Sequence, residues 1–128
     1  MKRYKKIIIS NPGRKSGGTN LLFAALAENI IKSDDYLVSI IDFRDGFITS
    51  YLSERELQFE LIEYNEHIYI KEECIFVINV LSAKQLGSKI KLNPKSKLLL
   101  YTTFPYDFYK YLPIYIIKMF LFSIKCKR

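Results

Sequence analysis

The fold is decided by residues 5–20, which read KKIIISNPGRKSGGTN. The three isoleucines at 7–9 predict a buried strand, and the following LLFAALA at 21–27 predicts a helix. A glycine-rich turn between a strand and a helix exposes unpaired backbone N–H groups at the positive end of the helix dipole, which favours phosphate. Arg14 and Lys15 add positive charge to this loop. The stretch therefore predicts a nucleotide or sugar-phosphate site at the edge of a parallel sheet.

The rest of the chain alternates apolar runs with polar connections. We expect a helix over about 19–32 and strands at 4–10, 36–43, 57–64, 74–80 and 97–103, with a turn at Asp45 and Gly46. Strands interleaved with crossovers predict an α/β fold, a Rossmann-like doubly wound and mostly parallel sheet in a single domain. Residues 1–104 form this domain, and residues 105–128 form an aromatic, basic and helical C-terminal segment.

The C-terminal segment contains a nearly continuous apolar run from Ile114 to Ile124. At about eleven residues it is too short to cross a bilayer, which takes about 20. Because a hydrophobic helix that closes a domain must pack on something, we interpret the ending as that of a truncated protein. The alternative is a helix that lies in a membrane interface between basic flanks.

Charge is divided unevenly along the 128 residues, whose formal net charge is +7. Residues 1–20 hold six basic and no acidic side chains, residues 21–83 hold four basic and twelve acidic, and residues 84–128 hold ten basic and one acidic. Basic ends suit phosphate-bearing ligands or anionic lipid headgroups. Cys74 and Cys126 are far apart and there is one histidine, so the sequence has no metal-ligand spacing and we expect no metal. The N-terminus leads directly into a strand without the apolar region of a signal peptide, so we expect a cytoplasmic protein.

The glycine loop departs from two common phosphate motifs. Gly13 and Gly18 have the separation of a Walker A motif, but Thr19 and Asn20 stand in place of its lysine and hydroxyl residue. The dinucleotide pattern of three glycines is absent as well. Asp42 ends the second expected strand, where a carboxylate commonly caps a turn or helix.

Three segments together resemble the N-terminal half of the retaining GT-B glycosyltransferases known as group 1 or family 4. They are IIISNPGRKSGGTNLLFAALAENI at 7–30, VSIIDFRDGF at 38–47 and KLLLYTTFPYDFYKYLP at 97–113. The family's GG loop matches Gly17 and Gly18, and its Leu-Ala helix end matches Leu26 and Ala27. Its second strand, which ends near an Asp, matches Asp42 and Asp45-Gly46. Phe104-Pro105-Tyr106 is similar to a His-Pro-Tyr segment of some members.

The resemblance implies a domain that binds the acceptor and contacts the donor diphosphate through Gly17, Gly18 and Thr19. Arg14, Lys15 and Tyr106 are the expected acceptor or anion contacts, and no catalytic residue is assigned. The implied substrates are a nucleotide sugar and a sugar or lipid-linked acceptor of cell-surface polysaccharide synthesis, reached at the inner face of the membrane. The family's second domain is missing and Phe104 replaces its histidine, so we expect no activity from this chain alone. A separate chain would supply the missing domain.

A flavodoxin-like oxidoreductase that binds FMN is the first alternative. Ser10, Ser16 and Thr19 lie in a loop close to the phosphate loop of that class. Against it, residues 81–85 offer no aromatic side chain to cover the flavin ring. Under the main hypothesis the protein has no cofactor.

The second alternative is non-catalytic, either a remnant or one subunit of a split transferase. The aromatic residues of 101–111, interleaved with Lys110, are also of a type that stacks nucleic-acid bases. Because no nucleic-acid module fits the chain, we expect no nucleic-acid partner.

Overall fold

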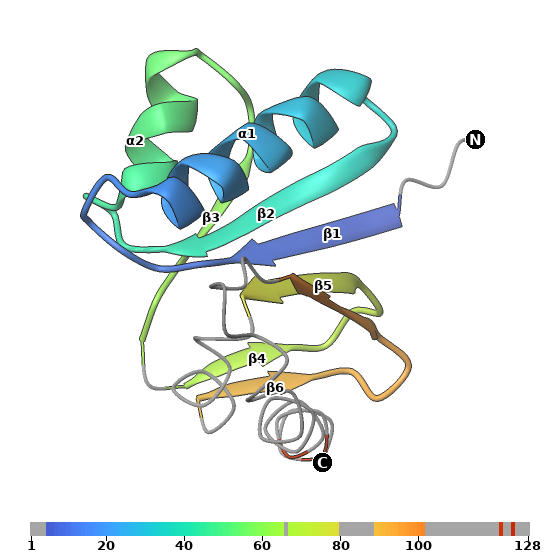
Figure 1. Cartoon of the computed structure of the whole chain (residues 1–128). Coiled ribbons are helices and arrows are strands. Elements are labelled where there is room, and N and C mark those ends of the chain that lie inside the picture. The colour runs from blue at the N-terminus through green and yellow to red at the C-terminus, as the bar shows by residue number, and fades with distance from the viewer. Residues whose placement is uncertain (1–4, 66, 80–88, 102–120, 122–123, 125–128) are drawn as a thin grey trace, which may run out of the picture.

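The structure is a computed structural model that describes residues 5–65, 67–79, 89–101, 121 and 124. Its centre is a five-stranded parallel sheet in the order β3-β2-β1-β5-β7 (Figure 1). The strands are β1 (Lys5–Ser10), β2 (Tyr36–Asp42), β3 (Glu60–Glu63), β5 (Ile75–Asn79) and β7 (Lys97–Tyr101). The expected α/β class with a Rossmann-like parallel sheet is confirmed.

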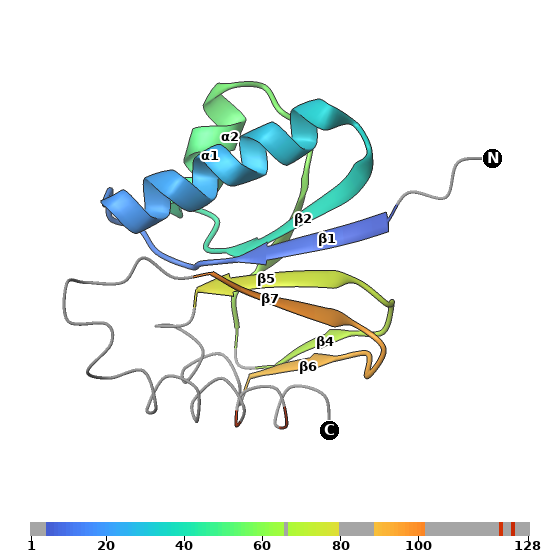
Figure 2. The same ribbon diagram turned by 45° about the vertical axis from the view of Figure 1, so that its right-hand side comes forward.

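Two helices cover one face of this sheet (Figure 2). Helix α1 (Gly18–Ser33) connects β1 to β2, and α2 (Phe47–Glu54) connects β2 to β3. Phe23, Ala24 and Ala27 of α1 are buried against Ile7, Ile9 and the other residues of the helix-side core. Burial of this apolar stripe is what holds α1 on the sheet, since a helix of this length is marginal by itself.

The opposite face of the sheet packs against a second, two-stranded parallel sheet. It consists of β4 (Ile68–Ile70) and β6 (Ile90–Leu92). Their isoleucine and leucine side chains join Ile8, Phe76 and Ile78 in a second buried cluster. The main sheet is therefore buried on both sides, which explains its continuous apolar strands.

The β4–β5 and β6–β7 segments form two stacked arches. Ile68 pairs with Ile90 and Ile75 pairs with Lys97, so both strand pairs keep one sequence offset. The turns that lead into β5 and β7 are also joined: the Cys74 N–H donates to Ser96 Oγ, 22 residues later, and the Lys97 N–H donates to the Cys74 carbonyl. The chain thus passes between the two sheets twice in the same way.

The structure departs from the sequence expectations in a few elements. Helix α2 and strands β4 and β6 were not expected, and β3 is shorter than the strand expected at 57–64. The turn at Asp45 and Gly46 is present and leads directly into α2. Cys74 is buried as a small apolar residue, and this burial raises the pKa of its thiol. Of the segment 105–128, only Leu121 and Ile124 lie in the described part, and both are helical and exposed.

Candidate functional site

The amino terminus of α1 lies near the point where the strand order of the main sheet reverses. Numbered along the chain, the five strands of the main sheet lie in the order 3-2-1-4-5, with the reversal between β1 and β5. In sheets of this kind, ligands bind outside the carboxyl ends of the strands at such a switch point. Here the residues at that point are Asn11, which follows β1, Asn79, which ends β5, and the first turn of α1.

The first turn of α1 has the properties of an anion-binding helix end. Gly17 is the N-cap, no side chain caps the helix, and the first turn carries no acidic residue. A Cβ added at Gly17 or Gly18 would meet no heavy atom within 4 Å. There is thus open space beside both glycines at the positive end of the helix dipole, where an anion would be favoured.

Three asparagine side chains form a hydrogen-bond chain at the switch point. Asn79 Nδ2 donates to Asn11 Oδ1 at 3.5 Å, and Asn11 Nδ2 donates to Asn20 Oδ1 at 2.5 Å. Asn20 Nδ2 then donates to the Lys15 carbonyl at 2.7 Å. The chain links the end of β5, the end of β1 and the start of α1. It holds the loop at 11–17 in a defined shape before any ligand arrives.

Asp42 anchors the other side of the same loop. Its carboxylate is fully buried and accepts the N–H groups of Gly13 at 3.2 Å and Thr49 at 3.0 Å, and the Thr49 hydroxyl at 2.9 Å. It therefore caps the start of α2 from the end of β2, as expected for a carboxylate at that position. Because its oxygens are engaged by the protein, Asp42 is not presented to a ribose hydroxyl as in dinucleotide-binding domains.

Arg14 and Lys15, the expected anion contacts, lie in the loop before α1. The Arg14 guanidinium forms an ion pair with Asp45 at 2.9 Å and lies 3.9 Å from the centre of the Phe43 ring. The hydrogen bond from Arg14 is the main cause that lowers the pKa of Asp45. An anion that recruits Arg14 must compete with this exposed contact. Lys15 is exposed at the same loop.

Ser10 is a buried polar residue at the carboxyl end of β1. Its side chain is inaccessible to solvent, and Ser10 Oγ has no hydrogen-bond partner among the described residues. Side chains alternate along a strand, so the Ser10 side chain lies on the same face of the sheet as Ile8, opposite α1. Ser10 therefore does not face the first turn of α1, although the FMN alternative includes its hydroxyl in the phosphate loop.

The structure brings together most of the residues that the sequence analysis singled out. Gly17, Gly18 and Thr19 form the start of α1, and Arg14 and Lys15 precede it. Tyr106 lies outside the described residues, so its expected role stays a prediction. Sequence reasoning missed Asn11, Asn20 and Asn79 as a group. The available signal was an asparagine at the end of each of two buried apolar runs.

Comparisons with protein-family models, with curated proteins and with solved structures gave no match. Within the described part of the chain, no three His, Cys, Asp or Glu side chains gather in a way that could hold a metal ion. No helix found among those residues is long and apolar enough to cross a membrane.

Proposed function

We propose that this chain binds a phosphate-bearing ligand of the nucleoside diphosphate class at the amino terminus of α1. The observation that carries the proposal is the uncapped Gly17-Gly18 helix start at the strand-order reversal, with open space above both glycines. Backbone N–H groups and the helix dipole would bind the diphosphate there. Lys15 and a released Arg14 would add positive charge.

The glycosyltransferase resemblance supplies the finer form of the proposal. The domain would contact the diphosphate of a nucleotide sugar, and glycosyl transfer to a sugar or lipid-linked acceptor would also require the second domain of that family. The proposal assigns ligand binding to these residues and no catalytic step. Association with a membrane face and with a separate partner chain belongs to the same proposal.

The FMN alternative is less favoured by the strand order. Flavodoxin-like sheets have the order 2-1-3-4-5, with the flavin between the first and third strands, whereas this sheet has the order 3-2-1-4-5. A direct comparison of FMN with UDP as ligands distinguishes the two hypotheses.

The test is a calorimetric titration of the purified chain with UDP, UDP-glucose, FMN and inorganic phosphate. We expect saturable UDP binding that Gly17→Val weakens at least ten-fold, because the valine side chain fills the space above the helix start. The backbone of Gly17 is extended (φ −167°), so valine there leaves the fold intact, which circular dichroism checks. The matched control is Leu37→Thr, an exposed residue at the other end of the sheet.

Absence of UDP binding, or binding unchanged by Gly17→Val, would overturn the proposal. Tight FMN binding with a yellow protein would replace it by the flavodoxin-like alternative.

A further inference from the structure

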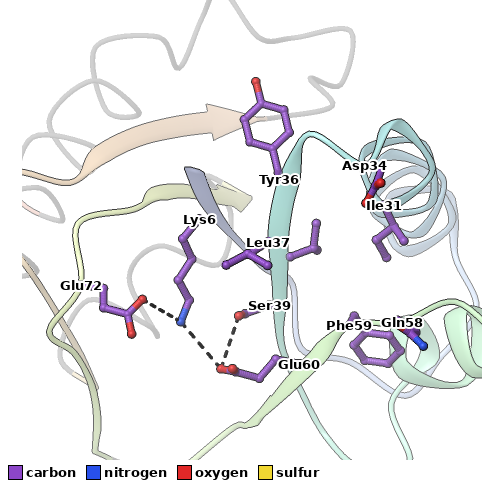
Figure 3. Close-up of a pocket in the computed structure, with 11 residues that line it drawn as sticks. Lys6, Ile31, Asp34, Tyr36, Leu37, Ser39, Gln58, Phe59, Glu60 and Glu72 are labelled. Carbon is purple, nitrogen blue, oxygen red and sulfur yellow. Dashed lines mark hydrogen bonds and ion pairs between the residues drawn. The ribbon is translucent and has the colours of Figure 1, made fainter. Parts of the chain in front are cut away.

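A cavity of about 640 Å³, drawn in Figure 3, is lined by the start of β2 and the end of α1, so it lies at the opposite end of the sheet from the α1 amino terminus. This volume is in the range of small-ligand pockets, about 300–1,000 Å³. Its walls come from the end of α1, the start of β2, the residues that lead into β3, the start of β1 and the β4–β5 turn. No part of the proposed diphosphate site contributes to it.

The cavity exists because β3 is shorter than β2. Pairing between the two strands begins at Ser39 and Glu60, so residues Tyr36–Val38 of β2 extend past the first pair. On their β3 side, no described strand pairs with these three residues. They offer about 10 Å of strand edge, at roughly 3.3 Å per residue. Such an edge can accept another chain by backbone hydrogen bonds.

The two sides of this edge differ in chemistry. On the helix side, the cavity is lined by Ile31, Val38 and Phe59, which belong to the apolar core under α1 and α2. On the other side, Lys6 Nζ lies 3.9 Å from Glu60 Oε1 and 3.4 Å from Glu72 Oε2, as the dashed lines in Figure 3 show.

The charge that this polar side presents to solvent is negative. The Lys6 side chain is 17% exposed, whereas those of Glu60 and Glu72 are 61% and 73% exposed. Asp34, at the end of α1 on the helix side, is a further carboxylate of the lining. The described part of this chain, whose net charge is +7, thus contains an acidic recess beside a strand edge with which no described strand pairs.

We propose that this recess binds an extended peptide segment with alternating apolar and basic side chains, added to β2 as a short strand. Successive side chains of a strand point to opposite faces, so the added segment places one set against Ile31 and Phe59 and the next set beside Glu60 and Glu72. Backbone hydrogen bonds to β2 provide the attachment, and the alternating pattern provides the selectivity. The inference is independent of the proposed diphosphate site.

The test uses a capped five-residue peptide of alternating lysine and valine as the probe. Titration into the ¹⁵N-labelled full chain is followed by NMR, and affinity is measured by fluorescence anisotropy of a labelled peptide. We expect saturable amide shifts centred on Tyr36–Ser39. The acidic counterpart, with glutamate in place of lysine, should not bind.

Two further comparisons distinguish strand addition from simple charge attraction. Glu72→Gln should weaken lysine–valine binding about two- to five-fold, as loss of a partly exposed charge pair does. Glu54→Gln, which removes an exposed acid of α2 that does not line the cavity, should leave affinity unchanged. The same peptide with N-methylated backbone amides should lose binding, because it cannot donate to the β2 edge.

Three results would each overturn the proposal: no saturable binding, shifts centred elsewhere, or equal affinity for the N-methylated peptide. The last would identify the recess as a site for an organic cation. Because UDP titration probes the other end of the sheet, failure of either proposal leaves the other standing.

Discussion

Asp42 and Gly46 are the residues that define how the glycine loop and α2 meet. The buried Asp42 carboxylate joins Gly13 to Thr49, and the Phe47 N–H donates to the Gly13 carbonyl at 2.8 Å. An aspartate after an apolar strand is a common turn or helix cap, so this role could be predicted. Its second contact, with a loop 29 residues earlier, depends on the parallel pairing of β1 and β2.

Gly46→Ala should destabilise the protein by about 1–3 kcal/mol, because an added Cβ at this position overlaps the carboxylate of Asp42. The measurement is the free energy of unfolding in urea. Gly17→Ala is the control, since its Cβ meets no atom within 4 Å, and it should change stability by less than about 0.5 kcal/mol. Equal stability of the two variants would contradict this account of Asp42.

Among the elements, α1 and α2 are joined by a polar contact at their exposed edge. Tyr51 OH donates to Glu28 Oε1 at 3.0 Å, and Lys32 and Arg55 lie within 3.5 Å of the other carboxylate oxygen. The Arg55 guanidinium also covers the Tyr51 ring at 3.4 Å from its centre. Together these contacts lower the pKa of Glu28, and the hydrogen bond from Tyr51 is the largest cause.

Tyr51→Phe should raise the pKa of Glu28 toward its ordinary value of 4.5, because it removes that hydrogen bond. A carboxyl whose pKa is lower in the folded state contributes stability above its unfolded pKa and loses it as pH falls through the folded pKa. The wild-type contribution should therefore fade below about pH 4.5, and less of it should be present in the variant.

The measurement is a ¹³C NMR titration of the glutamate carboxyl groups. Tyr69→Phe, which changes an exposed tyrosine of β4, is the control and should leave the Glu28 titration unchanged. An unaltered pKa of Glu28 in Tyr51→Phe would show that the lysine and arginine contacts dominate.

Element prediction from sequence succeeded where the apolar signal was long. The isoleucine-rich β1 and the residues of α1 were expected nearly at their observed bounds. Helix α2 was not predicted because it has only eight residues. Two of its buried residues, Ile48 and Leu52, are a single turn apart, which is too short a stretch to show a helical period. Strands β4 and β6 have three residues each, too few for an alternating pattern to stand out.

At the scale of the whole molecule, the main sheet lies between two different apolar layers. One is beneath α1 and α2, and the other is enclosed by the two stacked arches. Strand β5 joins them, because Phe76 points into the arch layer and Val77 into the helix layer. Loss of packing on one side should therefore weaken the whole sheet.

Phe76→Ala should lower the free energy of unfolding by about 3–5 kcal/mol, since the ring is fully buried and leaves a cavity. Leu99→Ala, which truncates a 54% exposed side chain on β7, should cost less than about 1 kcal/mol. Urea unfolding followed by far-UV circular dichroism and by tyrosine fluorescence provides the measurement. We expect coincident transitions from both probes, and separate transitions would show that the two layers unfold independently.

The class of fold and the position of the glycine loop follow from the sequence alone. Continuous apolar strands can be buried only in a sheet covered on both faces, and a strand–glycine–helix unit has few alternatives. The expectation of a phosphate site at this loop follows from that local pattern, whereas the diphosphate contacts expected at Gly17 and Gly18 are implied by the family resemblance.

The strand order, the asparagine chain and the recess beside β2 became visible only in the folded structure. Asn11, Asn20 and Asn79 meet because β1 and β5 are neighbours, although 68 residues separate Asn11 from Asn79. The recess likewise depends on where β3 begins to pair with β2. Such contacts join residues far apart in the chain, so the local pattern of apolar and polar residues cannot predict them.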